Sequence, residues 1–465
     1  MPGEIISQII ITACFIGVLI VILTDKLNRA ITALIGAVIV YFTLIFIEGR
    51  PFSIFVTLIF GEDNLHALIL ILGMLFIVQI CISAGVFQYI AFKLIKSTKG
   101  SPIRLLIVIS AITFLVATIM GNILTVLIMI PLTIDAARIL KIDPGPYIVC
   151  LAVTIPVGEI VFSISSVPSI LISTFAGLTF IEYFLNIGLF CFLLFGITII
   201  YFNLSFHNKL TTPAPRLVAV LMEYNAWNYV PNRTLFYKSL FILIAVLICF
   251  VVVPPPITPD MIALTGALIL LVISKINGKE IIEKIDLTLI LYLLAIFTIT
   301  GGMEEIGVIE TVGQAFSLLV GSNTFAILLS VLWISALLSS AVDNIPVVKV
   351  LLPIVSIMSG GYTPAYYSLT LGAGLGDNLT PLGDTIIVRS ITEEHGQRFS
   401  NSLFFRIGFK ASLIHLITIS IYYTILYYVA IGLIIILILG LLIFFLIFFR
   451  YRKNKKDKRD KELMV

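Results

Sequence analysis

The stretch SSAVDNIPVVKVLLPI, residues 339–354, lies where an apolar run should form a membrane helix, yet it carries polar and helix-breaking residues. Asp343, Asn344 and Lys349 occur in it together with two prolines. A charged side chain at the centre of a membrane helix costs on the order of 3 kcal/mol on insertion scales. Backbone without helical hydrogen bonds cannot face lipid either, so it must line a cavity that protein encloses or water fills. The stretch therefore predicts a binding site inside a membrane protein.

The composition of the whole chain is that of an integral membrane protein. Of its 465 residues, 60% are hydrophobic and only 12% are charged, whereas about 25% of the residues of a soluble domain are charged. Apolar stretches of about 17 to 25 residues recur along the chain, which is the length that an α-helix needs to cross roughly 30 Å of hydrocarbon. None of them alternates with the period of two that a membrane β-barrel requires. The predicted fold class is therefore all-α integral membrane.

The chain contains an internal repeat. The stretch LGMLFIVQICISAGVFQYI at 72–90 resembles LLAIFTITGGMEEIGVIET at 293–311 when they are aligned on a shared glycine. Polar, glycine and proline landmarks match as well as apolar residues, and this makes a duplication more probable than chance similarity between apolar segments. Three pairs of residues share one separation of 222 positions: Gly85 and Gly307, Asn122 and Asn344, and Pro131 and Pro353.

The predicted topology consists of two repeats of opposite orientation. We expect a re-entrant hairpin in each half, at 103–135 and 322–358, that enters and leaves the membrane on one face. Each half then makes five net crossings, and an odd number of crossings inverts the second repeat relative to the first. Lys and Arg in short loops mark the cytoplasmic side, which places the N-terminus outside and the C-terminus in the cytoplasm of a multi-pass plasma-membrane protein. The expected segments are the first inverted repeat (1–205), a cytoplasmic linker (206–234), the second inverted repeat (235–428), one extra membrane helix (429–449) and a basic cytoplasmic tail (450–465).

Each half contains two stretches through which a helix cannot run without interruption. They are 119–131 and 155–170 in the first half, and 341–353 and 372–385 in the second. Glycine lets the chain turn without a steric penalty, and proline marks where helical hydrogen bonding stops. The N–H groups of a half-helix favour anions, while unwound carbonyls and Asn or Thr side chains offer oxygens to cations. We expect these stretches to meet around a cavity near the membrane midplane.

The order of these segments resembles the ion transporter superfamily. The motifs DNIP at 343–346 and GAGLGDNLTPLG at 372–383 carry the resemblance, which extends to about residue 428. The superfamily groups permeases related to arsenite transporters, the P protein, NhaD-type sodium/proton antiporters and citrate transporter-like proteins. The resemblance implies two hairpins whose Asn-bearing tips meet two broken helices around the substrate, a scaffold domain, a homodimer and an elevator-type movement. By motif match, Asn122 and Asn344 are the tip residues, and Asn378 and Thr380 belong to the second broken helix.

The first half departs from the pattern of this family. Gly121 precedes Asn122 where relatives have aspartate, and SSVPS at 165–169 replaces a turn rich in Gly, Asp and Pro. Glu159 stands at the position that matches Asp377. The candidate binding residues are Asn122, Thr125, Gly158, Glu159, Ser165, Ser166, Asp343, Asn344, Lys349, Asp377, Asn378, Thr380 and Asp384.

The two buried charges, Glu159 and Lys349, raise a hypothesis of their own. They could form a pair, or one of them could carry a proton, because a buried acid or amine readily changes its protonation state. Other roles are open as well. Asn122 could be a hydrogen-bonding contact between helices, Glu159 could belong to a structural ion pair, and Lys349 could extend to the surface from a shallow hairpin. Asp384 could cap the helix that follows it.

No signature of an enzyme or of an ATP-driven pump is present. The chain lacks a Gly-Lys-Ser/Thr loop, a His-Glu-x-x-His motif and a Gly-x-Ser-x-Gly motif. Its five cysteines lie singly, without the spacing of a metal site or a disulfide framework. We expect no enzyme activity, no cofactor and no nucleic-acid partner. The expected coupling ion is a proton or a sodium ion, the latter near Asn344 and Asn378.

These features predict a secondary active transporter for a small inorganic or organic ion, in particular an anion or oxyanion, coupled to a proton or sodium gradient. A sodium/proton antiporter is the alternative if Asp343, Asp377 and Glu159 converge as cation ligands. An anion permease is favoured if Lys349 and the half-helix N-termini point into the cavity. An ion channel, a different class of protein, would use the same polar groups.

Overall fold

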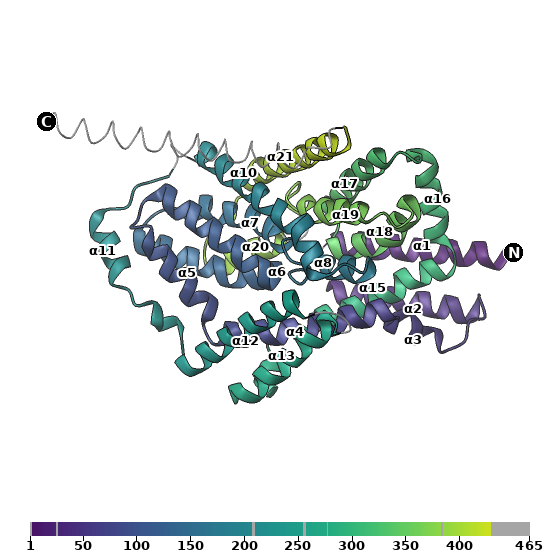
Figure 1. Ribbon diagram of the computed structural model, residues 1–465, viewed down its shortest axis with the longest axis horizontal. Coiled ribbons are helices and arrows are strands. Elements are labelled where there is room, and N and C mark those ends of the chain that lie inside the picture. The colour runs from purple at the N-terminus through teal and green to yellow at the C-terminus, as the bar shows by residue number, and fades with distance from the viewer. Residues whose placement is uncertain are drawn as a thin grey trace. The chain divides into compact units, whose positions relative to one another are not determined.

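The computed structural model describes residues 2–24, 27–206, 210–253, 257–276, 278–382 and 385–428 (Figure 1). All regular structure within these ranges is helical. Nine of the described helices are long and apolar enough to cross a membrane. The described residues up to Leu413 pack into one compact unit, and the described residues 414–428 belong to a second unit. The extra membrane helix expected at 429–449 and the basic tail at 450–465 lie outside the described residues.

The helices of the first half and the linker follow one another with short connections. They are α1 (Pro2–Leu23), α2 (Arg29–Phe46), α3 (Ile54–Phe60), α4 (Glu62–Ser83), α5 (Val86–Ser97), α6 (Pro102–Leu140), α7 (Gly145–Glu159), α8 (Val167–Phe175), α9 (Phe180–Tyr183), the π-helix η1 (Phe184–Gly188), α10 (Leu189–Phe206), and, in the linker, α11 (Pro215–Glu223) and the short 3-10 helix η2 (Ala226–Tyr229).

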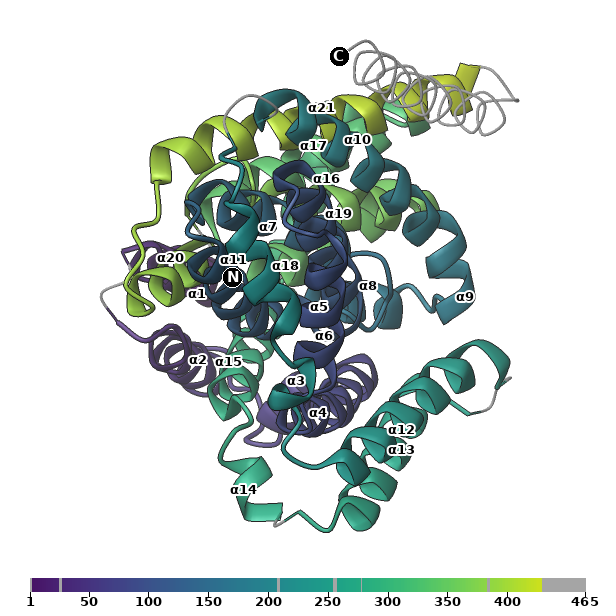
Figure 2. The same cartoon turned by 90° about the vertical axis from the view of Figure 1, so that its left-hand side faces the viewer.

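The second half repeats the same order of elements. Its helices are α12 (Arg233–Val252), α13 (Pro259–Ser274), α14 (Gly278–Ile282), α15 (Leu287–Glu305), α16 (Val308–Val320), α17 (Thr324–Ala341), α18 (Asn344–Ser359), α19 (Thr363–Gly376), α20 (Thr385–Glu394) and α21 (Asn401–Tyr428). Figures 1 and 2 show α12 and α13 lying side by side, and α17, α18 and α19 grouped together.

The duplication predicted from the sequence appears in the backbone. Gly85 precedes α5 with φ 77° and Gly307 precedes α16 with φ 73°, so both residues adopt the left-handed conformation that favours glycine. Helix packing is duplicated too, because α6 packs on α7 as α17 packs on α19, and α2 packs on α15 as α13 packs on α4. The chain thus has the predicted architecture, an all-helical membrane fold of two inverted repeats.

Both predicted helix interruptions of the hairpins are present. In α6 the backbone leaves helical geometry at Gly121, with φ 66° and ψ −167°, and a Cβ there would lie 2.5 Å from the carbonyl oxygen of Ser165. In the second half α17 ends at Ala341, Val342 is extended, and α18 begins at Asn344. Only glycine combines this positive φ with such a close approach, so Gly121 makes a break one residue long.

Both broken helices are present as well, and matching hydrogen bonds hold them to the hairpins. α7 ends at Glu159 and α8 begins at Val167, while α19 ends at Gly376 and α20 begins at Thr385. The Ser165 hydroxyl donates to the Thr118 carbonyl oxygen (2.5 Å). In the second half the Thr380 hydroxyl donates to the Ser340 carbonyl oxygen. Because Thr118 and Ser340 are also 222 positions apart, the same contact occurs once in each repeat.

Candidate functional site

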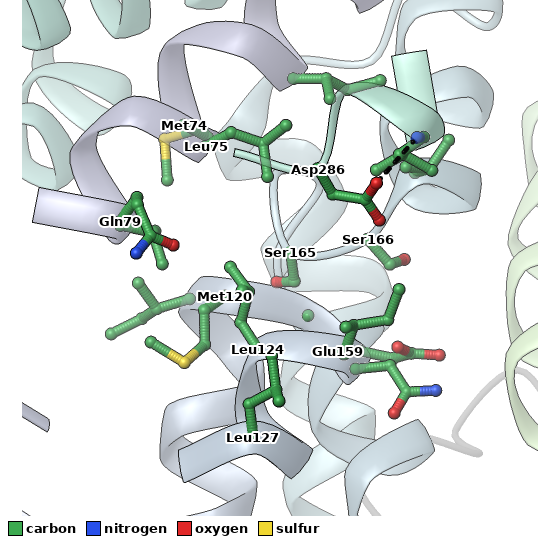
Figure 3. Close-up of a pocket in the computed structure, with 18 of the residues that line it drawn as sticks. Met74, Leu75, Gln79, Met120, Leu124, Leu127, Glu159, Ser165, Ser166 and Asp286 are labelled. Carbon is green, nitrogen blue, oxygen red and sulfur yellow. Dashed lines mark hydrogen bonds between the residues drawn. The ribbon is translucent and has the colours of Figure 1, made fainter. Parts of the chain in front are cut away.

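A cavity of about 500 Å³ lies where the first broken hairpin and the first broken helix meet α2, α4, α5, α15 and the start of α18 (Figure 3). Its apolar wall comes from α4, from which Met74 and Leu75 project. Its polar wall comes from the segment between α7 and α8 and from the N-terminal end of α15. It reaches the surface beside Lys284 and Asp286, both exposed residues. This is a pocket of the size that small-molecule sites have.

The two hairpin-tip asparagines line this one cavity. Asn122 follows the break at Gly121, and Asn344 is the first residue of α18. Asn344 is buried, with 6% of its surface exposed, and Asn122 is half-buried. Two residues 222 positions apart in the sequence are therefore brought to one place by the packing of the repeats. This is the arrangement that the duplication predicted.

Three further candidates of the first half lie in the cavity wall. Glu159, the last residue of α7, is only 2% exposed. Ser165 holds the hairpin through its bond to Thr118. Ser166 caps α8, since its hydroxyl accepts from the N–H of Ser169 (3.4 Å) and donates to the Ser169 hydroxyl (2.9 Å). Figure 3 shows Glu159, Ser165 and Ser166 on the same side of the cavity.

The cavity is also lined by charged residues from outside the predicted segments, Arg29, Lys284 and Asp286. The Arg29 Nη1 atom, at the start of α2, lies 3.2 Å from Oδ2 of Asp343. Asp286 caps α15 by accepting from the N–H of Leu289 (3.2 Å) (Figure 3). Lys284 donates to the Ser83 hydroxyl (3.5 Å). A site that holds both cationic and anionic side chains can bind a charged solute together with a counter-charge.

The sequence of the chain matches a known protein family. A family model described as a citrate transporter, CitMHS, matches residues 19–372 and 256–464. The chain belongs to the CitMHS family. An uncharacterized transporter of Mycobacterium tuberculosis is 27% identical over 432 residues, which cover 91% of this chain and 99% of the relative. The P protein of Homo sapiens is 25% identical over 522 residues, which cover 93% of this chain and 61% of that protein.

A solved structure supports the fold of this CitMHS protein. The YdaH transporter of Alcanivorax borkumensis matches it with a TM-score of 0.55 over 80% of this chain and 87% of that chain, at 14% identity. The predicted resemblance to the ion transporter superfamily is confirmed by the family match and by the similarity to the P protein. The chain is a multi-pass membrane transporter, and several of its relatives are named as transporters.

Several predicted residues of the CitMHS protein hold the second half together and do not line the cavity. Asp377 accepts from the Ser339 hydroxyl (2.9 Å) and from Nδ2 of Asn344 (3.1 Å). Asn378 donates to the Val153 carbonyl oxygen (2.9 Å), which joins the two repeats. Thr380 bonds to Ser340. These groups fix the tip of α18 against the second broken helix.

Two candidates of the first half have packing roles. The Thr125 hydroxyl donates to the Gly121 carbonyl oxygen (2.5 Å) within its own hairpin. Gly158 allows α7 to approach α6, because a Cβ there would lie 2.6 Å from the Phe114 carbonyl oxygen. Asp384 lies outside the described residues.

Lys349 lies away from the cavity wall and from Glu159. Its Nζ donates to Oδ1 of Asn64 (2.6 Å) on α4 and sits over the ring of Phe297 at 4.8 Å. Glu159 lines the cavity, and Lys349 is absent from the residues that line it. The hypothesised pair of Glu159 and Lys349 is thus replaced by a contact of Lys349 with Asn64.

Sequence reasoning missed Gln79, which projects into the cavity from α4 (Figure 3). It is the one polar amide in the apolar run from 67 to 80. That isolation was a signal, because an amide in hydrocarbon needs a partner or water. Its position in the second repeat, 222 residues later, holds Gly301, which packs on Leu58. The second repeat thus has no amide at this position, so the shared fold does not require one.

The sodium site predicted from the sequence lies near Asn344 and Asn378. Within the described part of the chain, no group of three or more His, Cys, Asp or Glu side chains is placed to hold a metal ion. Asn344 bonds to Asp377 and Asn378 bonds to Val153, so their amide nitrogens are turned to protein acceptors. Sodium near these two residues stays a prediction.

Proposed function

We propose that this CitMHS transporter is a secondary active transporter that moves a small anionic solute, coupled to a proton or sodium gradient. The observation that carries the proposal is the cavity itself. It joins both hairpin tips, a buried carboxyl at Glu159 and the guanidinium of Arg29 in one space among membrane helices. Such a set of costly polar groups is retained inside a membrane protein where a charged solute binds. The family description, citrate transporter, supports a carboxylate as the solute.

Glu159 is the group that we assign to proton coupling. Its carboxyl lies in the cavity wall with 2% of the residue exposed. Protonation removes the charge of a carboxylate in such a place, so the proton and the solute can enter together with less net charge. Asp377, at the matching position, is bonded to two donors and serves the hairpin instead.

The movement that we propose is of the elevator type. The hairpins and broken helices, α6 to α8 and α17 to α20, would move as one body against α2, α4, α13 and α15. The cavity opens beside Lys284 and Asp286, in the connection before α15, which the basic residues of the short loops would place on the cytoplasmic side. The described state then opens inward, with the N-terminus outside, the C-terminus in the cytoplasm of the plasma membrane, and two copies forming a dimer.

Purified protein in proteoliposomes tests the proposal. Uptake of citrate, succinate, arsenite and sodium is measured under imposed proton and sodium gradients. We expect uptake of at least one anion to be driven by a gradient, and counterflow to be stimulated by the same anion inside. Uptake without stimulation from the opposite side would indicate a channel. Vesicles that carry none of the three anions would refute the proposal.

A sodium/proton antiporter is the second candidate, and one observation favours it. Three carboxylates line the cavity, those of Glu159, Asp286 and Asp343, against the two cations Arg29 and Lys284. An excess of carboxylates favours a cation. Sodium uptake that an outward proton gradient drives, in vesicles that do not transport the anions, would select this candidate.

A further inference from the structure

We propose that Arg29 is the residue that recognises a carboxylate of the transported solute, and that Asp343 occupies the place of that carboxylate until the solute arrives. The inference rests on the proposed anion transport and assigns the recognition of the solute's carboxylate to one side chain. It makes Arg29, which lies outside both hairpins and both broken helices, a specificity-determining residue.

The geometry of the pair supports an exchange of partners. Arg29 and Asp343 both line the cavity, with their side chains 30% and 9% exposed and 3.2 Å between Nη1 and Oδ2. The guanidinium carbon lies 5.7 Å from the centre of the Tyr292 ring, which orients it from one side. A guanidinium binds carboxylates through paired N–H groups in a fixed plane. A carboxylate in the cavity can therefore reach the same face of Arg29 that Asp343 now contacts.

Asp343 has a second partner that remains when Arg29 is released. Its Oδ1 accepts from the N–H of Ile345 (3.0 Å), which caps α18. A carboxylate at a helix N-terminus is stabilised by the cap bond and by the helix dipole. Releasing Oδ2 from Arg29 therefore does not leave an uncompensated charge. Asp343 is a displaceable partner for Arg29, in contrast to Asp377 with its two buried side-chain donors.

The pair has no equivalent in the other repeat. Gly121 stands 222 positions before Asp343 and offers no carboxylate. The stretch 261–270 matches 31–40, so the equivalent of Arg29 is Pro259. The contacts that the fold needs, such as those of Ser165 and Thr380, occur in both halves. The pair is therefore not part of the repeated packing, and its place in the cavity wall makes it accessible to a solute.

The test compares the two halves of the pair in the reconstituted full chain, with radiolabelled citrate as the probe. Arg29→Gln is expected to raise the citrate concentration for half-maximal counterflow by about 10- to 100-fold, the effect of losing a charged hydrogen-bonding partner. Arg29→Lys is expected to show a smaller rise, because the ammonium cannot bind a carboxylate through two parallel bonds. Asp343→Asn is expected to lower that concentration about threefold or more, since asparagine preserves the helix cap but competes less for Arg29.

Opposite signs for Arg29→Gln and Asp343→Asn are the diagnostic result. If the pair were only structural, both variants would break the same contact and impair transport in the same direction, and this would overturn the inference. Arg50→Gln is the matched control, because it breaks an ion pair with Glu305 (2.9 Å) that does not line the cavity, and it should leave citrate counterflow unchanged. Wild-type vesicles that carry no anion would instead refute the proposed function. Wild-type vesicles that carry arsenite but neither citrate nor succinate would overturn the carboxylate inference alone.

Discussion

The two hairpin tips are copies of one structural unit, yet they have different partners. The first tip, Gly121 and Asn122, lies beside Glu159 in the cavity wall. In the second tip, Asn344 is bonded to Asp377, the equivalent of Glu159, and Asp343 is paired with Arg29. Glu159 thus lines the cavity in one half, while its equivalent Asp377 lies outside the cavity lining and accepts hydrogen bonds from Ser339 and Asn344 in the other. The two halves share one fold but differ in their side chains. We call Asn122 and Glu159 the binding wall, and the bonded pair Asn344 and Asp377 the holding wall.

Replacing each of the two equivalent acids, Glu159 and Asp377, by its amide tests this division most severely. In Glu159→Gln the side chain keeps its size but can no longer carry a proton. For a transporter that moves one proton with each solute, a pH difference of about two units can sustain a solute gradient of roughly 100-fold, since each pH unit is worth about 1.4 kcal/mol. We expect this accumulation to vanish in Glu159→Gln while citrate counterflow persists. Uptake under an imposed pH gradient, compared with counterflow in the same vesicles, measures both.

The equivalent substitution in the second half is the control for that experiment. Asp377→Asn changes the buried carboxylate that accepts from Ser339 and Asn344. We expect it to lower thermal stability and to leave the stimulation by a pH gradient in place. Wild-type accumulation in Glu159→Gln would contradict the assignment of proton coupling to Glu159. Loss of accumulation in Asp377→Asn alone would assign the coupling to the second half.

The tip asparagines give the second comparison, in stability. Asn344→Leu removes the Nδ2 donor from Oδ2 of Asp377, which is 4% exposed. Leaving a buried charged acceptor with one partner fewer costs about 2–3 kcal/mol. The free energy of unfolding should fall by this amount, with a lower midpoint of thermal unfolding in detergent micelles.

Asn122→Leu is the matched variant at the other tip. Asn122 is half-buried at the cavity surface, so its replacement is expected to abolish citrate counterflow with a smaller change in the midpoint of unfolding. Equal losses of stability at the two tips would contradict the division into a binding wall and a holding wall.

Much of the frame was predictable from the sequence, because it follows from local chemistry. Gly85 and Gly307 mark turns that need a left-handed residue, and Asn122 and Asn344 stand next to breaks that lipid cannot solvate. These features depend on a few adjacent residues and on a separation that counting reveals. The helix interruptions and the meeting of the tips were therefore accessible without coordinates.

The cavity wall was not predictable in the same way, because it depends on the rotation of whole helices. Arg29 lies outside every interrupted stretch that the sequence predicted, but α2 turns it toward Asp343. Lys349 was expected in the cavity, but α18 directs it to Asn64 on the opposite part of α4 from Gln79. A helix places each residue by 100° steps, and an apolar run in a membrane gives little periodicity from which to infer the buried face.

Gln79 provides the smallest and sharpest test of the contrast between the repeats, because its counterpart is Gly301. Gln79→Leu removes the amide of α4 from the cavity and preserves the bulk of the side chain. The loss of one neutral hydrogen bond to a solute, about 1 kcal/mol, should raise the citrate concentration for half-maximal counterflow roughly fivefold. Gln8→Leu is the control, because Gln8 donates to the Ile306 carbonyl oxygen (2.9 Å) and does not line the cavity. It should reduce stability and leave that concentration unchanged. If Gln79→Leu had no effect on counterflow while Arg29→Gln did, the solute would contact α2 and the tips alone, and the apolar wall of α4 would serve only to shape the cavity.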